Sequence, residues 1–174
     1  EEYSLEKTLP EVVAVVNKFA EEHNCHIPVI AAGGVYTGED IYNMMELGAS
    51  GVQMGTRFVT TYECDASDEY KQTYINAKKE DIRIVKSPVG MPGRAIYNDF
   101  MAKSSVETFK LKKCHQCIST CKAKDIPYCI TDALVNAANG DVDNALLFCG
   151  EKAYKATRLE HVSDIFNEIV GSVN

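Results

Sequence analysis

Two apolar runs, each with glycine near its end, enclose an amphipathic segment in the first third of the chain. The first run occupies residues 27–34 and ends in two glycines, and the second occupies residues 51–58, with a glycine at position 55. Between them, apolar residues recur at helical spacing over residues 41–47. Short apolar runs with β-branched residues are typical of parallel strands buried on both faces. The pattern predicts a strand–helix–strand unit.

The helix in this unit has recognisable signals at both ends. Thr37 is a candidate N-cap, and Asp40 stands three residues later, which is a variant of the capping box. Gly48 follows the last apolar position and suits the left-handed residue that ends many helices. We therefore expect a helix between Thr37 and Gly48, and a second strand that begins at Val52.

A right-handed crossover sets two such strands side by side, with their C-terminal loops on one edge. Gly33, Gly34 and the pair Gly55–Thr56 would then lie together. Glycine lacks a Cβ, so its backbone N–H can approach a ligand closely, and clustered N–H groups bind phosphate. Spacing alone leaves two interpretations open: a phosphate site, or glycines that only permit tight turns.

The rest of the chain carries weaker signals. Pro10 falls in the first turn of a helix that follows Thr8, where no N–H is needed. Arg94 either reaches an anionic ligand or makes a local ion pair, and the local pair is the commoner use of an isolated arginine. Helices are predicted over residues 8–23, 70–79, 131–138, 141–148 and 162–170, a strand over 82–85, and a loop over 87–93.

Four cysteines form the second distinctive pattern: Cys114, Cys117, Cys121 and Cys129. Four thiolates are a ligand set for zinc or an iron–sulfur cluster, but this spacing matches no zinc or ferredoxin pattern closely. On a helix, the first three would share one face, as small apolar residues packed in a core also do. We expect packed free thiols and assign no metal ligand.

Composition narrows the class of protein. The chain has 174 residues, a net charge of −7 and 45% hydrophobic residues, so it can bury the core of one domain. No basic cluster is denser than residues 110–113, which argues against nucleic acid as a partner. No apolar run approaches the roughly 18 residues of a membrane span. Seven cysteines, an odd number, favour a reducing cytoplasm over a disulfide scaffold.

Residues 28–35 and 48–58 resemble the last two βα units of the nitronate monooxygenase family, formerly called 2-nitropropane dioxygenase. That family includes the closely similar flavin-dependent enoyl-ACP reductase of bacterial fatty-acid synthesis. The resemblance is dense over residues 27–58 and continues more loosely through residues 87–98. It implies an α/β fold: residues 1–97 would be the C-terminal fragment of an FMN-binding TIM (β/α)8 barrel, and residues 98–174 a mostly helical, cysteine-containing extension.

The resemblance also implies a cofactor site. Carried over residue by residue, the family's FMN contacts fall on Ala32, Gly33, Gly34, Gln53, Met54, Gly55 and Thr56. The glycines and Thr56 would donate to the phosphate, while Gln53 and Met54 would line the ribityl or ring region. The family's candidate catalytic histidine lies upstream of this segment. None of the four histidines here falls on a loop expected to face the flavin, so we assign no catalytic acid or base.

Three functions follow as expectations. The first is an FMN-dependent nitronate monooxygenase, which converts alkyl nitronates and dioxygen into carbonyl compounds and nitrite. The second is an FMN-dependent enoyl-ACP reductase that uses NAD(P)H and an enoyl thioester. A complete barrel needs about 250 residues, so the third is an inactive truncated module that forms a homodimer through exposed half-barrel edges. The enzymes would bind a small-molecule substrate, with no nucleic acid or membrane partner.

Overall fold

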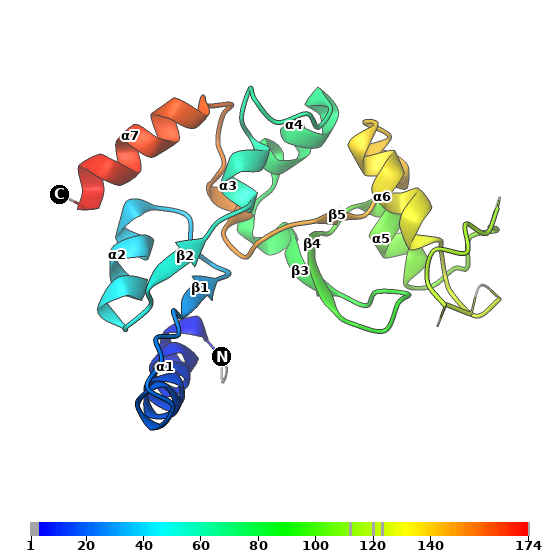
Figure 1. The fold of residues 1–174 in the computed structure, drawn as a ribbon. Helices are drawn as coiled ribbons and strands as arrows, with labels where there is room; N and C mark the ends of the chain where they lie inside the picture. The colour runs from blue at the N-terminus through cyan, green and yellow to red at the C-terminus, as the bar shows by residue number, and fades with distance from the viewer. Residues whose placement is uncertain (1–3, 112, 120, 123, 174) are drawn as a thin grey trace.

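The computed structural model describes residues 4–111, 113–119, 121–122 and 124–173, which form an α/β arrangement around two small sheets (Figure 1). In these residues, no helix is both long enough and apolar enough to cross a bilayer. The strands are β1 (Ile30–Ala32), β2 (Gly51–Gln53), β3 (Ile82–Val85), β4 (Gly93–Ile96) and β5 (Leu147–Phe148). The α-helices are α1 (Leu5–Glu22), α2 (Gly38–Glu46), α3 (Thr56–Val59), α4 (Asp68–Asn76), α5 (Asp99–Ser104), α6 (Ile130–Ala138) and α7 (Val162–Val173), joined by 3-10 turns η1 (Lys79–Asp81), η2 (Val142–Asn144) and η3 (Ala153–Lys155).

The predicted strand–helix–strand unit is confirmed. Strands β1 and β2 pair in parallel, with Ile30 opposite Gly51, and α2 connects them. The capping box is also present: Asp40 N–H donates to the Thr37 hydroxyl, and the Asp40 carboxylate accepts the Thr37 N–H. Gly48 has a φ of +97°, so it is the left-handed residue that ends the helix.

Helix α1 begins one turn earlier than predicted. Ser4, rather than Thr8, is its N-cap residue, and Pro10 therefore lies inside the helix. The Thr8 hydroxyl donates to the Ser4 carbonyl at 3.1 Å, a bond within the first turn. Leu9 is buried and packs with the β1–α2–β2 unit, whereas Val15 and Phe19 are exposed. The predicted apolar stripe is thus only partly covered.

The predicted helix over residues 141–148 is wrong. A 3-10 turn, η2, occupies its first part, and β5 then pairs antiparallel with β4, with Leu147 opposite Ile96. Burial of apolar side chains and hydrogen bonds from Asn98 both favour the extended form. Leu146 and Leu147 are fully buried, and the Asn98 side chain donates to the carbonyls of Val142 and Ala145, which a helix would use internally.

The other predicted elements are present with small shifts. The helix over 70–79 appears as α4, capped by Ser67, and those over 131–138 and 162–170 appear as α6 and α7. The strand over 82–85 is β3. The division at residue 97 stays a prediction, but β5 pairs with β4, and α7 packs beside α2 (Figure 1), so the two ranges are in contact.

The expectation of cysteines packed on a helix is also wrong. The described residues from Ser105 to Cys129 form neither helix nor strand. Cys114 and Cys117 are exposed, while Cys121 and Cys129 are half-buried, so they do not fill the core. The core instead consists of clusters around Tyr74, around Phe100 and around Met44.

Tyr74 gives a direct test of this packing. Its ring is 1% exposed, and its hydroxyl donates to the Phe148 carbonyl of β5. Changing Tyr74 to phenylalanine should lower the free energy of unfolding by about 1–2 kcal/mol, because the partly buried Phe148 carbonyl loses its donor. Urea denaturation measures the change. The matched control is Tyr42→Phe, at a residue that is 51% exposed, where a loss of similar size would contradict the explanation.

Candidate functional site

The loops that follow β1 and β2 meet at one edge of the parallel pair, as the sequence predicts. They line a cavity of about 60 Å³ whose walls include Gly33 and Gly34 from the first loop, and Gln53, Met54, Gly55 and Thr56 from the second. Ala32 precedes this lining, as the last residue of β1. The arrangement brings backbone groups from two neighbouring loops to a single small space.

The first loop has a conformation that requires glycine. Gly33 has a φ of +104° and Gly34 a φ of +67°, which side-chain-bearing residues rarely adopt. A Cβ built on Gly33 or on Gly55 would meet no atom within 4 Å. Neither of these two glycines is needed to avoid a clash, and open space lies beside the backbone of both loops.

Thr56 joins the second loop to a third segment. Its hydroxyl accepts the Gly150 N–H at 2.7 Å, and a Cβ on Gly150 would lie only 2.7 Å from the same oxygen. Gly150 therefore permits this close approach. A hydroxyl can accept one hydrogen bond and donate another, so the contact is compatible with Thr56 donating to a ligand oxygen.

Val35 and Tyr36 of the first loop also line the cavity, as do Gly150, Glu151 and Lys152 from a third segment. None of these five was predicted from the sequence. A signal was available. Residues 145–149 are an apolar run followed by glycine, the same pattern that marks β1 and β2. The erroneous helix over residues 141–148 concealed it.

Lys152 fixes the position of the first loop through Asp40. The lysine Nζ lies 2.6 Å from Asp40 Oδ1, and Asp40 Oδ2 accepts the N–H groups of Tyr36 and Thr37 at 2.9 and 3.0 Å. Burial alone would raise the pKa of this carboxyl. The hydrogen bond from Lys152 and the two backbone N–H groups outweigh burial and lower the pKa from 3.8 to about 2.

This lowered pKa predicts a specific loss of stability in acid. A carboxyl that binds protons less readily when folded stabilises the fold above its unfolded pKa, and that contribution disappears as pH falls through the folded value. The free energy of unfolding should therefore drop between about pH 4 and pH 2, and this part of the drop should be missing in Asp40→Asn. Urea denaturation across that range, with the exposed Asp143→Asn as control, measures it. Equal slopes for all three proteins would contradict the assignment.

Glu151 places a negative charge at the mouth of the cavity. Its carboxylate lies 3.8 Å from the Arg94 guanidinium, and it comes within 3.9 Å of a Cβ built on Gly34. Arg94 therefore forms an ion pair, and its partner is distant in the sequence. An anion that enters the cavity requires Glu151 to stay neutralised by Arg94, or to turn away on its half-exposed side chain.

Arg57 belongs to α3, next to Thr56, and holds the segments around the site together. The side chain is 3% exposed, and its Nη1 donates to the Tyr36 carbonyl at 2.9 Å and to Glu168 of α7 at 3.1 Å. Nη2 contacts Glu168 and lies 3.8 Å from Glu160. Arg57 thus connects the loop after β1 with the C-terminal helix. It is a structural residue.

The chain is similar in fold to solved structures of α/β enzymes. A FabK variant from Thermotoga maritima is 25% identical, with a TM-score of 0.72, over 99% of this chain and 48% of its own. Nitroalkane oxidase from Streptomyces ansochromogenes is 21% identical, with a TM-score of 0.67, over 98% of this chain and 43% of its own. The second likeness shows the fold alone.

Sequence comparison then identifies the family. The family model for nitronate monooxygenase matches residues 1–172, so the chain belongs to this family. A probable nitronate monooxygenase of Staphylococcus saprophyticus is 44% identical over 78 residues, which are 45% of this chain and 22% of the relative. Its counterpart in Staphylococcus aureus strain Newman is 39% identical over 97 residues, which are 56% of this chain and 25% of the relative. These matches span about a quarter of each relative's length.

Proposed function

We propose that this chain supplies the FMN-binding loops of a flavin-dependent nitronate monooxygenase. The observation that carries the proposal is the convergence of two glycine-bearing loops on one cavity at the C-terminal edge of a parallel strand pair. In TIM (β/α)8 barrels, the loops after the last two strands commonly hold a cofactor phosphate. Membership of the nitronate monooxygenase family supports an oxidoreductase that acts on nitronates.

The residues present fit a phosphate group. The open space beside Gly33 and Gly55 lets a phosphate oxygen approach their N–H groups, and a cavity of about 60 Å³ suits a phosphate but not a flavin ring. Gly34 and Thr56 would add two further N–H donors. Gln53 and Met54 would then lie along the ribityl chain or the ring edge. When bound, FMN would supply the redox chemistry, and these residues would hold and orient it.

The expected reaction converts an alkyl nitronate and dioxygen into a carbonyl compound and nitrite. The protein in its full length should bind FMN, show the visible absorption of a flavin, and consume oxygen when propyl-2-nitronate is added. A colourless protein that takes up no added FMN would overturn the proposal. Flavin binding without oxygen consumption would remove the nitronate reaction and leave the cofactor site.

Enoyl-ACP reduction is the second candidate, and the likeness to FabK over 99% of this chain favours it. That reaction would draw hydride from NAD(P)H and deliver it to an enoyl thioester. The same flavoprotein distinguishes the two candidates. Consumption of NADH with a crotonyl thioester, in the absence of activity on propyl-2-nitronate, would favour the reductase.

A third candidate is an inactive module that pairs with a second copy. Val15 and Phe19 on α1 and Ile30 on β1 are 70%, 49% and 53% exposed, which leaves apolar surface beside the parallel pair. Burying such surface drives association. Light scattering should then report a dimer for the 174-residue chain, and a monomer at high concentration would exclude this candidate.

A further inference from the structure

Four of the seven cysteines line one pocket, which is formed by the chain between α5 and α6. The pocket has a volume of about 260 Å³, and its wall includes Cys114, Cys117, Cys121 and Cys129. All four are free thiols.

The segment that carries them has little to hold its shape. Its described residues between α5 and α6 include no helix or strand, a length of irregular chain that is uncommon in compact domains unless it serves a function. Its base is fastened where Phe109 N–H donates to the Pro127 carbonyl at 2.7 Å and where Phe109 packs against Phe100. This base joins the two ends of the segment, and the cysteine-bearing part lies between them.

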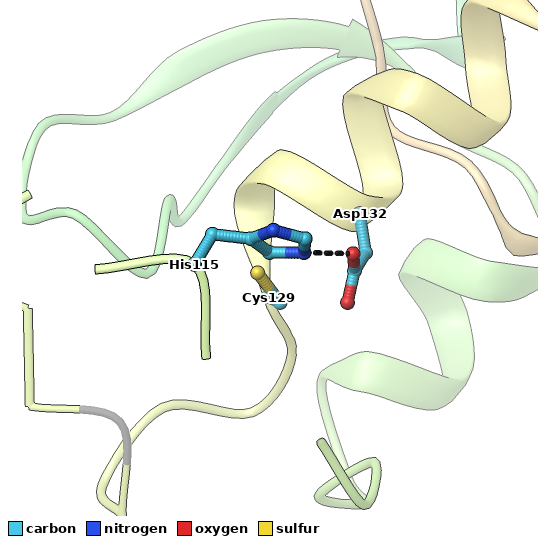
Figure 2. Close-up of side chains that lie close together, drawn as sticks. All are labelled: His115, Cys129 and Asp132. Atoms are coloured by element: carbon cyan, nitrogen blue, oxygen red, sulfur yellow. Dashed lines mark hydrogen bonds and ion pairs between the residues drawn. The ribbon is translucent and has the colours of Figure 1, made fainter. Parts of the chain in front are cut away.

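Polar contacts fasten this part to the first turn of α6. His115 Nε2 lies 2.7 Å from Asp132 Oδ1, and Cys117 Sγ lies 3.0 Å from Thr131 Oγ1. Figure 2 shows the imidazole of His115 between the Cys129 sulfur and the Asp132 carboxylate. The ligand atoms of these three residues all lie within 4.8 Å of one another. Histidine held by a carboxylate is a frequent companion of metal centres.

We propose that Cys114, Cys117, Cys121 and Cys129 bind a thiophilic metal centre, either a Zn²⁺ ion or an iron–sulfur cluster. Four thiolates on one pocket are the donor set that both centres take, and hard cations such as Mg²⁺ and Ca²⁺ prefer oxygen. Cys129 is the N-cap residue of α6, so the pocket lies at the start of that helix. Asp132 orients His115, and this pair is a positioning contact beside the centre.

The geometry also predicts what binding would do. Among the described residues, the group whose ligand atoms already lie within 4.8 Å of one another is His115, Cys129 and Asp132, and the other three cysteines belong to no such group. A metal centre must therefore draw the sulfurs of Cys114, Cys117 and Cys121 toward Cys129. Because the site forms only when this segment closes, metal binding should protect the segment from proteolysis.

Metal analysis of anaerobically purified protein tests the proposal. We expect close to one zinc ion per chain without sulfide, or iron with an equal amount of acid-labile sulfide, and the two results distinguish the two centres. Metal-free protein titrated with Co²⁺ alone should then develop thiolate-to-metal charge-transfer bands. Protein that carries only traces of both metals and gives no such bands would overturn the proposal.

Serine variants test the ligand set. Each of Cys114→Ser, Cys117→Ser, Cys121→Ser and Cys129→Ser should lower the bound metal or the Co²⁺ affinity at least tenfold. Cys25→Ser, at an exposed thiol beyond the end of α1, should retain both and is the matched control. His115→Ala should keep the metal, with affinity lower by about tenfold. Equal loss in Cys25→Ser, or loss in His115→Ala together with full retention in Cys114→Ser, would contradict the four-thiolate assignment.

Discussion

Replacing Arg57 with alanine should lower the free energy of unfolding by about 3 kcal/mol. The substitution leaves the Tyr36 carbonyl without its buried donor and removes the cation that Glu160 and Glu168 face. It also removes the guanidinium that lies over the Tyr36 ring, 5.1 Å from its centroid. Glu168 is half-exposed and recovers part of its hydration, so we place the loss below the upper range for a fully buried ion pair.

Arg158→Ala is the control for this prediction. Arg158 is 77% exposed and lies 3.4 Å from the same Glu160. Its substitution therefore removes a surface partner of that carboxylate and leaves the buried Arg57 in place. We expect a change within about 0.5 kcal/mol. Urea denaturation of the three proteins gives both values. A small loss for Arg57→Ala, or similar losses for the two variants, would show that Arg57 does not hold the segments together.

Replacing Gly55 with valine should weaken FMN binding by about 100-fold or more. Each charge-assisted hydrogen bond from backbone to phosphate is worth about 1.5–3 kcal/mol, and a branched side chain at this position would separate the phosphate from two donors. Gly55 has a φ of −122°, which any residue adopts, and its Cβ would meet no atom within 4 Å. The fold should therefore survive, and the effect should fall on the ligand.

Gly171→Val is the matched control, because a Cβ built on Gly171 in α7 also meets no atom within 4 Å. Quenching of flavin fluorescence by the full-length protein measures the affinity, and circular dichroism checks the fold. Unchanged affinity in Gly55→Val would place the phosphate elsewhere, even if the protein proved to be a flavoprotein. Lost helicity in Gly55→Val would assign the glycine a structural role instead.

Local signals predicted the β1–α2–β2 unit well, because each of its features acts over a few residues. Thr37 and Asp40 form the capping box, Gly48 takes the left-handed conformation, and β1 lies parallel to β2. The convergence of the two glycine-bearing loops then follows from the handedness of the crossover. The roles of the seven residues assigned to FMN stay predictions.

The errors fall where distant contacts decide the outcome. Residues 141–148 have helical spacing, but the open edge of β4 and the side chain of Asn98 favour a strand there. The cysteines have helical spacing too, yet His115 and Cys117 contact the start of α6 across an irregular segment. The spacing of apolar residues within one segment cannot reveal a distant partner such as β4 or the start of α6. Arg57 lies within the second apolar run, but its burial depends on an acidic residue 111 positions later.

The long reach of these contacts affects how the chain is made. Arg57 pairs with Glu168, Asp40 with Lys152 and Thr56 with Gly150, across sequence separations of 111, 112 and 94. A ribosome delivers the glycine-bearing loops long before the partners that close them. The N-terminal loops therefore emerge with an uncompensated arginine, and Glu168 follows 111 residues later. Contacts of such high order slow folding, and this interval is the period in which a chaperone would be most useful.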